Sequence, residues 1–289
     1  NCARYCGSEV DFVDIDPSTG LMSVSALEIK LKCALSNGNL PKIVVPVHLA
    51  GSSCDMSAIK ALAKIYRFFI VEDASHAIGG SYRGEPVGNC KYSDITVFSF
   101  HPVKIITTAE GGLATTNDAA LAQRMSDLRS HGITKDQSRF KQPIQGPWSY
   151  EQQELGFNYR MTDLQAGLGL SQLKRLGLIV LERQRLFENY RQLFSGLPLK
   201  LLEIPKEVKS ALHLAVVRLS DPDSTHHRRV FEGLRSYGIG VQLHYIPVHL
   251  HPYYRNLGFK DGDFPESEFY ANNAISLPIY PGLQEADQV

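Results

Sequence analysis

Short apolar runs alternate with helical patterns in the first quarter of the chain. We predict strands for EVDFVDI (9–15), KIVVPVHL (42–49) and RFFIVEDA (67–74). Between these runs lie a predicted amphipathic helix at 25–35 and a second at 55–66, where apolar residues follow the helical period and Asp55 is placed as N-cap. This alternation predicts βαβ units and a mostly parallel sheet that is covered on both faces.

The later part of the chain predicts a different organisation. Further strands are expected at 94–100, 111–116 and 212–220, and further helices at about 118–131, 181–194 and 226–237, followed by the apolar run 238–247. The polar, Gln-rich segment 132–156 has no clear period and is long enough to be a functional loop. We therefore expect a large domain over 1–175, a linking helix over 176–195 and a smaller C-terminal α/β domain over 196–289.

Charge and cysteine usage exclude several classes of protein. Thirty basic and thirty acidic residues leave a formal net charge of zero, which gives no electrostatic reason to expect nucleic acid or an anionic membrane as a partner. No apolar run approaches the ~18 residues that a bilayer span needs, and the start, NCARYCGSEVDF, has neither an initiator Met nor a signal-peptide layout. The five cysteines form no CxxC pair, which favours reduced thiols and a cytoplasmic location.

Asp73 is the first candidate for chemistry. It lies at the C-terminal tip of the predicted strand 67–74, and ligands of open α/β sheets bind outside the carboxyl ends of the strands. Taken alone, the residue is explained at least as well as a cap of the following turn.

Lys104 is the second candidate. It follows the predicted strand 94–100 by four residues and lies among Val103, Ile105 and Ile106. An apolar neighbourhood disfavours the ammonium form and lowers the pKa of the amine, as a nucleophile that forms a Schiff base requires. In isolation, an ordinary surface lysine remains the commoner explanation.

The third candidate is the polar triplet Asn158, Tyr159 and Arg160. It precedes an evident helix start, with Thr162 or Asp163 as N-cap. Free backbone N–H groups at a helix start favour an anion site. An ordinary loop that enters a helix explains the triplet equally well, so only the order and spacing of the three candidates point to one chemistry.

Four strings, EDASHAIGGSYRGEPVGN, SDITVFSFHPVKIITTAEGG, ELGFNYRMTDLQAGLGLSQL and LPIYPGL, resemble the sugar aminotransferases of the DegT/DnrJ/EryC1/StrS family. The resemblance extends over essentially the whole chain. It implies the aspartate-aminotransferase-like fold, fold type I of the enzymes that use pyridoxal 5'-phosphate (PLP), with a large α/β domain and a smaller C-terminal domain. HPVKIITTAEGG and GPWSYEQQELGFNYR are most similar to the branch of this family that serves pseudaminic acid biosynthesis.

The resemblance implies a role for each residue that matches a family motif. Lys104 would form the Schiff base with PLP and move the proton, and Asp73 would keep the pyridine nitrogen protonated. His76 would pack near the ring of the cofactor, and Ser99 would hydrogen-bond its phosphate. Asn158 would reach the phosphate from a partner subunit, so the resemblance implies a homodimer with a shared active site.

The resemblance also implies the substrates. Glutamate would donate the amino group, with Arg160 on its carboxylate, and a UDP-linked 4-keto-6-deoxy-N-acetylhexosamine would accept it at C4. The remaining candidates for sugar contact are His101, His244, Tyr245 and His249. The N-terminal portion of the family, which supplies a phosphate loop and an aromatic stacked on PLP, has no counterpart in this sequence, so we expect a chain without it to bind PLP weakly.

Other readings fit less well. His244, His249 and His251 lack the Cys or carboxylate companions of a metal site, so we expect none. No G-x-S-x-G elbow supports a hydrolase, and no G-x-G-x-x-G supports a nicotinamide-binding protein. The related sugar dehydratases carry His at the Schiff-base position, whereas this chain has Lys104. Two alternatives stay open: an aminotransferase for a different nucleotide keto-sugar, and a non-catalytic homologue or fragment of the fold.

Overall fold

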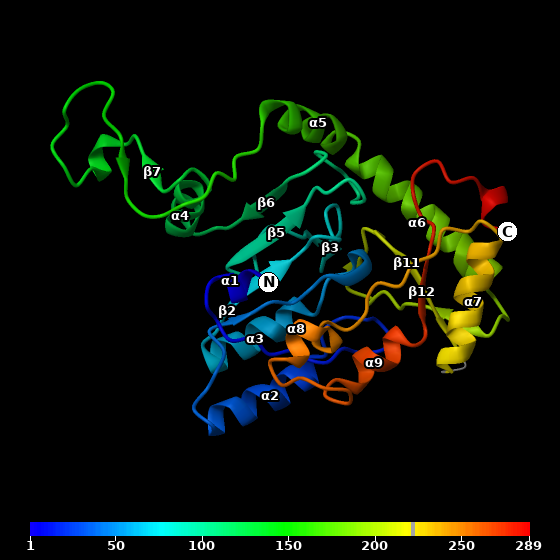
Figure 1. Ribbon diagram of the computed structural model, residues 1–289. Coiled ribbons are helices and arrows are strands. Elements are labelled where there is room, and N and C mark those ends of the chain that lie inside the picture. Colours follow the sequence, from blue (N-terminus) through cyan, green and yellow to red (C-terminus); the bar gives the residue numbers. More distant parts are fainter. Residues whose placement is uncertain (221–222) are drawn as a thin grey trace.

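The computed structural model describes residues 1–220 and 223–289 (Figure 1). At its centre is a four-stranded sheet with the order β1-β2-β5-β6, in which β1, β2 and β5 run parallel and β6 runs antiparallel to β5. Its strands are β1 (Ile43–Val44), β2 (Phe69–Asp73), β5 (Ile95–Ser99) and β6 (Gly112–Thr115). This sheet and the helices that follow it confirm the predicted α/β class.

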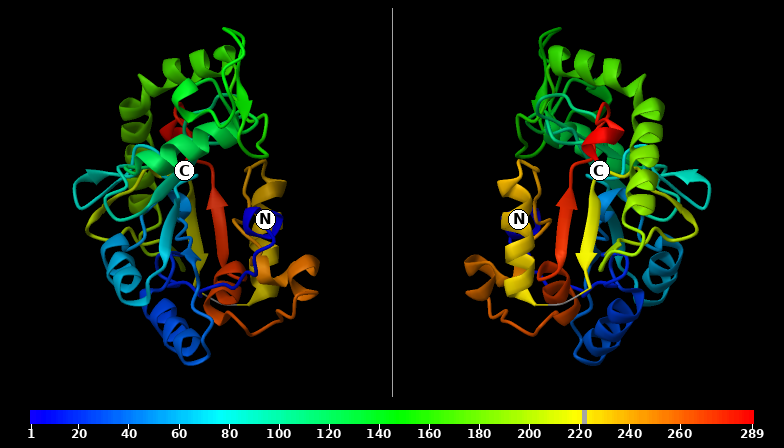
Figure 2. Two further views of the ribbon diagram at one scale, coloured as in Figure 1. Left: turned by 90° about the vertical axis from the view of Figure 1, so that its left-hand side faces the viewer. Right: turned by 90° about the vertical axis from the view of Figure 1, so that its right-hand side faces the viewer.

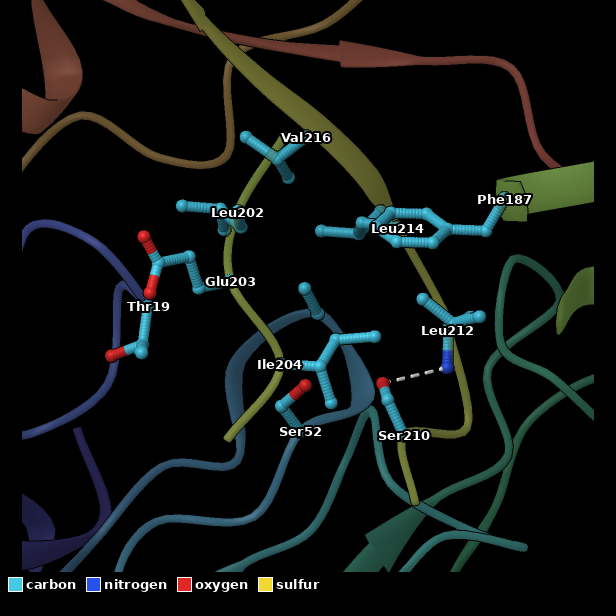
Figure 3. A pocket seen from close by; sticks show the side chains of 11 residues that line it. Thr19, Ser52, Phe187, Leu202, Glu203, Ile204, Ser210, Leu212, Leu214 and Val216 are labelled. Carbon is cyan, nitrogen blue, oxygen red and sulfur yellow. Dashed lines mark hydrogen bonds between the residues drawn. The ribbon is translucent and has the colours of Figure 1, made fainter. Parts of the chain in front are cut away.

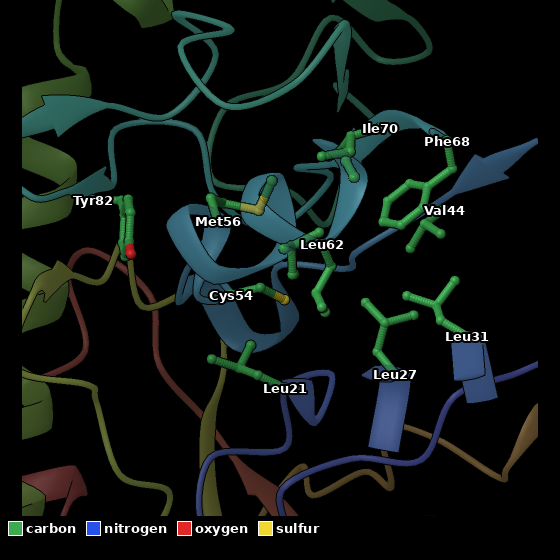
Figure 4. Close-up of a cluster of buried hydrophobic side chains, with 12 residues drawn as sticks. Leu21, Leu27, Leu31, Val44, Cys54, Met56, Leu62, Phe68, Ile70 and Tyr82 are labelled. Carbon is green, nitrogen blue, oxygen red and sulfur yellow. The ribbon is translucent and has the colours of Figure 1, made fainter. Parts of the chain in front are cut away.

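Two helices, α2 (Val24–Ser36) and α3 (Met56–Tyr66), pack on one face of the sheet. Figure 4 shows their contact, where Leu27 and Leu31 of α2 lie near Val44 of β1 and Leu62 of α3. The start of α3 follows from its sequence, because the Asp55 carboxylate accepts the backbone N–H of Ala58 at 3.1 Å, as predicted for its N-cap.

The segment between the sheet and the long helices projects from the body. After α4 (Ala119–Arg129), the strands β7 (Ile133–Thr134) and β8 (Glu151–Gln152) pair at the base of an extended arm. Figure 2 shows the arm, in green, at the end of the molecule opposite to α2. The predicted functional loop is therefore a protruding arm. A separate small sheet has the order β10-β3-β4, from Val208–Lys209, Ser81–Tyr82 and Glu85–Pro86.

The C-terminal part is built on a second sheet, antiparallel and of order β12-β11-β9. Helices α6 and α7 pack on one face of it, which carries Val217 and Leu277, and Tyr270 of α9 packs on the opposite face with Val216. The helices are α5 (Asp163–Leu173), α6 (Leu176–Leu193) and α7 (Ser224–Ser236), with the short α8 (Pro252–Arg255) and α9 (Pro265–Ala271), and the strands are β9 (Leu199–Leu201), β11 (Ala215–Leu219) and β12 (Ala274–Leu277). Within the described ranges, no helix is long and apolar enough to cross a membrane.

The predicted strand at 9–15 is wrong. Its one ladder contact is an isolated bridge between Ile15 and Met22. The Asp14 carboxylate instead accepts the backbone N–H groups of Glu266 and Ser267 at the start of α9 (2.9 and 2.8 Å). The segment is held instead by side-chain contacts with the C-terminal part, where Phe12 packs against Tyr254 and Phe264. The short helix α1 (Cys2–Tyr5) precedes it.

Candidate active site

Asp73 lies where β2 ends, and the backbone on both sides of it is held. Its N–H donates to the carbonyl of Pro46 (2.9 Å) and its carbonyl accepts the N–H of His48 (3.0 Å). One carboxylate oxygen accepts the N–H of Ser75 (3.0 Å). A carboxylate with a single hydrogen bond of this kind at a strand tip retains free lone pairs for a ligand.

Lys104 lies in the turn after β5. Its N–H donates to the carbonyl of His101 (2.9 Å), and its neighbours Ile105 and Ile106 are buried in the core beneath the turn. Between these buried neighbours and the surface, the Lys104 side chain is half-buried. Burial lowers the pKa of Lys104 below its usual value, and the charge of Asp73 opposes this shift. The two residues therefore lie within each other's electrostatic field, and the structure brings them together.

His76 joins the same cluster. Its side chain is only 6% exposed, and its Nε2 lies 3.4 Å from the hydroxyl of Tyr245. Burial and the charge of Lys104 lower the pKa of His76 to about 3, against the opposing effect of Asp73. Its Nδ1 is buried and has no hydrogen-bond partner in the part of the chain that the structure describes. His76 is therefore a neutral imidazole with an unused polar atom.

The segment 244–245 completes the cluster from the C-terminal part of the chain. The Nδ1 of His244 lies 2.8 Å from the Ser276 hydroxyl, and burial and then Lys104 lower the pKa of His244. Burial and the charge of Asp73 raise the pKa of Tyr245. His244 and Tyr245 therefore lie near the amine of Lys104, although they are about 140–170 positions away in sequence from Lys104 and His76.

His213 belongs to this cluster and was missed by the sequence analysis. Its ring lies 4.4 Å from that of His76 and is also 6% exposed. Burial, then the proximity of His76 and the charge of Lys104, lower the pKa of His213 to about 2. In sequence it is a polar residue within the largely apolar run 212–220, and a histidine in such a run is more often a core residue than a site residue. The only available signal was its position just before a buried strand.

The turn that carries His213 is tightly constrained. Leu212 has a positive φ of 51°, and a Cβ placed on Gly51 would lie 2.6 Å from the Leu212 nitrogen. The buried guanidinium of Arg183 donates to the carbonyls of Leu212 (3.1 Å), His213 (3.2 Å) and Ile279 (2.9 Å). Such a conformation persists only where its surroundings over-determine it.

Two further candidates flank Lys104, and three others lie elsewhere. The Ser99 hydroxyl accepts the N–H of His101 (3.4 Å), whose own side chain is exposed. The structure leaves Asn158 and Arg160 exposed, and Asn158 forms an isolated bridge with Ser130 after α4, with no contact to the Lys104 cluster among those described. His249 is buried, with its Nε2 2.8 Å from the Glu268 carboxylate, so its ring faces α9.

Two hollows of the described chain lie apart from this cluster. One is a small hollow of about 10 Å³, lined mainly by apolar side chains including Phe187, Leu202 and Val216 (Figure 3). It is large enough for roughly one water molecule. The other, of about 270 Å³, lies on the arm between Phe140, Trp148 and Tyr150. Neither contains a titratable group of the Lys104 cluster.

The cluster suits a ring cofactor with an aldehyde. Lys104 has an amine of lowered pKa, Asp73 has a free carboxylate edge for a ring nitrogen, and His76 and His213 have buried Nδ1 atoms without partners among the described residues. Buried polar atoms of this kind normally have a hydrogen-bond partner. The residues present therefore fit PLP.

The chain is similar to a known protein family over its whole length. The DegT/DnrJ/EryC1/StrS aminotransferase family matches residues 1–289. Spore coat polysaccharide biosynthesis protein SpsC of Bacillus subtilis is 36% identical over 292 residues, which span 99% of this chain and 72% of that protein.

Two solved structures share the fold. PseC of Helicobacter pylori, described as an aminotransferase involved in the biosynthesis of pseudoaminic acid, has a TM-score of 0.88 and 30% identity, with 99% of this chain and 72% of its own covered. The PLP form of Spr1654 from Streptococcus pneumoniae has a TM-score of 0.87 and 29% identity, with 99% and 74% covered.

Proposed function

Because the chain belongs to the DegT/DnrJ/EryC1/StrS family of PLP-dependent sugar aminotransferases, we propose that it aminates C4 of a UDP-linked 4-keto-6-deoxy-N-acetylhexosamine, with glutamate as donor. This is the reaction of a UDP-4-amino-4,6-dideoxy-N-acetyl-β-L-altrosamine transaminase of pseudaminic acid biosynthesis. The similarity to PseC supports the choice of sugar. The observation that most directly supports amino transfer is the half-buried amine of Lys104 beside Asp73.

Each residue of the cluster has a defined task in this proposal. Bound PLP supplies an aldehyde that carries the amino group and a ring that takes up electrons. The amine of Lys104 would hold the cofactor covalently and would then move a proton between substrate atoms, for which its lowered pKa keeps more of it unprotonated. Asp73 would stabilise a proton on the ring nitrogen, and neutral His76 would line the ring site without adding charge.

The other assignments complete the site. Ser99 donates to the phosphate of the cofactor, Asn158 reaches that phosphate from the second subunit of a homodimer, and Arg160 holds the donor carboxylate. The exposure of Asn158 and Arg160 beside a protruding arm supports a role outside their own subunit. The sugar contacts are His101, His244, Tyr245 and His249. For His249, the pair with Glu268 competes with this task. Five free cysteines support a cytoplasmic location.

An absorbance experiment on the full-length protein tests the proposal. The PLP-loaded protein should lose the visible absorbance of its cofactor on addition of glutamate and regain it on addition of the UDP-linked 4-keto sugar. The matched controls are the sugar of opposite ring configuration and a 3-keto nucleotide sugar. If a control restores the absorbance and the proposed sugar does not, the substrate assignment is wrong.

A different nucleotide keto-sugar is the second candidate, and one observation favours it. SpsC, at 36% identity, is described as a protein of spore coat polysaccharide biosynthesis, so similar chains serve other glycans. The same panel of sugars separates the two candidates. Protein that binds PLP but never responds to an amino donor would instead be the non-catalytic homologue.

A further inference from the structure

A buried polar pair lies directly behind the candidate active site. His48 is completely buried, and its Nε2 lies 2.7 Å from a carboxylate oxygen of the buried Glu72. The other carboxylate oxygen of Glu72 accepts the hydroxyl of Thr96 at 3.0 Å and that of Ser93. A carboxylate without access to water is costly unless donors satisfy it, so this position is closely specified.

His48 uses both of its ring nitrogens. The backbone N–H of Cys54 points at Nδ1 (3.3 Å), so Nδ1 accepts and Nε2 carries the proton that is donated to Glu72. Burial alone would raise the pKa of Glu72, but the hydrogen bond and the charge of His48, together with the hydrogen bonds from Ser93 and Thr96, outweigh it and lower that pKa. The pair therefore consists of an ionised carboxylate and a buried imidazole that donates to it, and, although burial opposes this, the contacts with Cys54 and Glu72 raise the pKa of His48 to about 9.

The same histidine also holds Asp73 through the backbone. The N–H of His48 donates to the Asp73 carbonyl (3.0 Å), and the Asp73 N–H donates to Pro46 (2.9 Å). Successive side chains of a strand point to opposite faces, so Glu72 and Asp73 share one peptide unit but face the buried and the ligand side. Fixing Glu72 from behind thus fixes the direction in which Asp73 points.

We propose that His48 and Glu72 are positioning residues that hold the carboxylate of Asp73 at its place beside Lys104. The proposal rests on the proposed function, in which Asp73 meets the ring of the cofactor. Neither His48 nor Glu72 touches the reacting atoms. Their effect comes through the strand tip, where a shift of about 1 Å is enough to cost roughly 100-fold in rate.

The test compares His48→Leu with His48→Gln in the full-length protein. Leu removes the donor to Glu72, whereas the amide nitrogen of Gln can replace Nε2. We expect His48→Leu to weaken PLP binding to the apoprotein about tenfold or more. It should also shift the pH profile of the absorbance of bound PLP and lower kcat about 10- to 100-fold, with KM for glutamate changed less than about twofold. His48→Gln should recover most of each effect.

Tyr190→Phe is the matched control for a loss of stability alone. It removes a buried hydrogen bond of 2.8 Å to the Pro278 carbonyl, in the C-terminal part of the chain. We expect it to leave the PLP affinity and the pH profile unchanged. Wild-type affinity and an unchanged pH profile in folded His48→Leu would overturn the proposal.

If His48→Leu does not fold, Thr96→Val and Ser93→Ala decide the question. Each removes one donor to Glu72 with little change of shape, and we expect smaller effects in the same direction. No change of PLP affinity or pH profile in both variants would overturn the proposal. PLP affinity and the reaction with glutamate need no sugar, so an incorrect sugar assignment would leave this test intact.

Discussion

The two faces of the central sheet differ, although the same strands form both. On the closed face, Val44, Ile70 and Phe98 are buried. On the open face, Ile43 is 54% exposed and Phe69 63% exposed, although both are apolar. The register pairs Ile43 with Phe69 and Val44 with Ile70, so each pair belongs to one face.

The candidate chemistry follows the same division. Asp73 shares the open face with Phe69, because side chains alternate along β2. Glu72 shares the closed face with Ile70 and has three donors. We therefore expect different tasks for these adjacent carboxylates: Glu72 on the closed face contributes to stability, and Asp73 on the open face is available to a ligand. The following predictions, from the largest effect to the smallest, test this division.

Lys104→Ala should lower turnover by at least about 10⁴-fold, because the variant lacks both the nucleophile and the proton carrier. The measurement is the rate of amino transfer under single-turnover conditions, with thermal unfolding as a check of the fold. Lys91→Ala is the control, since it removes an exposed lysine that pairs with Glu85. Turnover of Lys104→Ala near the wild-type rate would contradict the assignment.

Asp73→Asn should lower turnover about 10²- to 10³-fold, as expected when one preorganised electrostatic group is lost. Its free energy of unfolding should change by less than about 0.5 kcal/mol, because an amide oxygen can still accept the single bond from Ser75. The two quantities come from steady-state kinetics and urea denaturation. A large loss of stability with normal turnover would show that Asp73 stabilises the fold, as expected of the closed face, and does not act on a ligand.

Ile70→Ala and Phe69→Ala compare the two faces at neighbouring positions of β2. Ile70 is completely buried, so its truncation should lower the free energy of unfolding by about 2–5 kcal/mol. Phe69 is largely exposed, and its truncation in this chain should cost less than about 1 kcal/mol. Urea denaturation of both variants measures the difference. Equal losses would show that the open face is covered in solution.

The two neutral histidines predict a pH dependence of stability. The pKa values of about 3 for His76 and about 2 for His213 lie below the ordinary 6.5, so the unfolded chain binds protons first as pH falls. Their contribution is complete above pH 6.5 and decreases from there towards pH 3, by at most about 1.4 kcal/mol per pH unit for each histidine. Urea denaturation of the apoprotein at pH 7, 6 and 5 measures this slope. The double variant His76→Gln, His213→Gln should flatten it, and an unchanged slope would refute the assignment.

Much of the site was predictable because its signals are local. The strand tip at Asp73, the turn with Lys104 among apolar residues, and the helix start at Thr162 each depend on a few neighbouring residues. The Thr162 cap is confirmed by a reciprocal capping box with Gln165. The prediction at 9–15 failed because Asp14 bonds to α9, about 250 residues away.

The sequence alone determined the class of fold and predicted Lys104 and Asp73 as candidate site residues, because periodicity and motifs depend on short stretches of chain. Only the tertiary structure decided that His213 lies against His76, that His48 supports Asp73 from behind, and that His249 faces Glu268. These contacts join segments that are far apart in the chain. Their geometry depends on strand register and on the packing of distant elements, which no local pattern specifies.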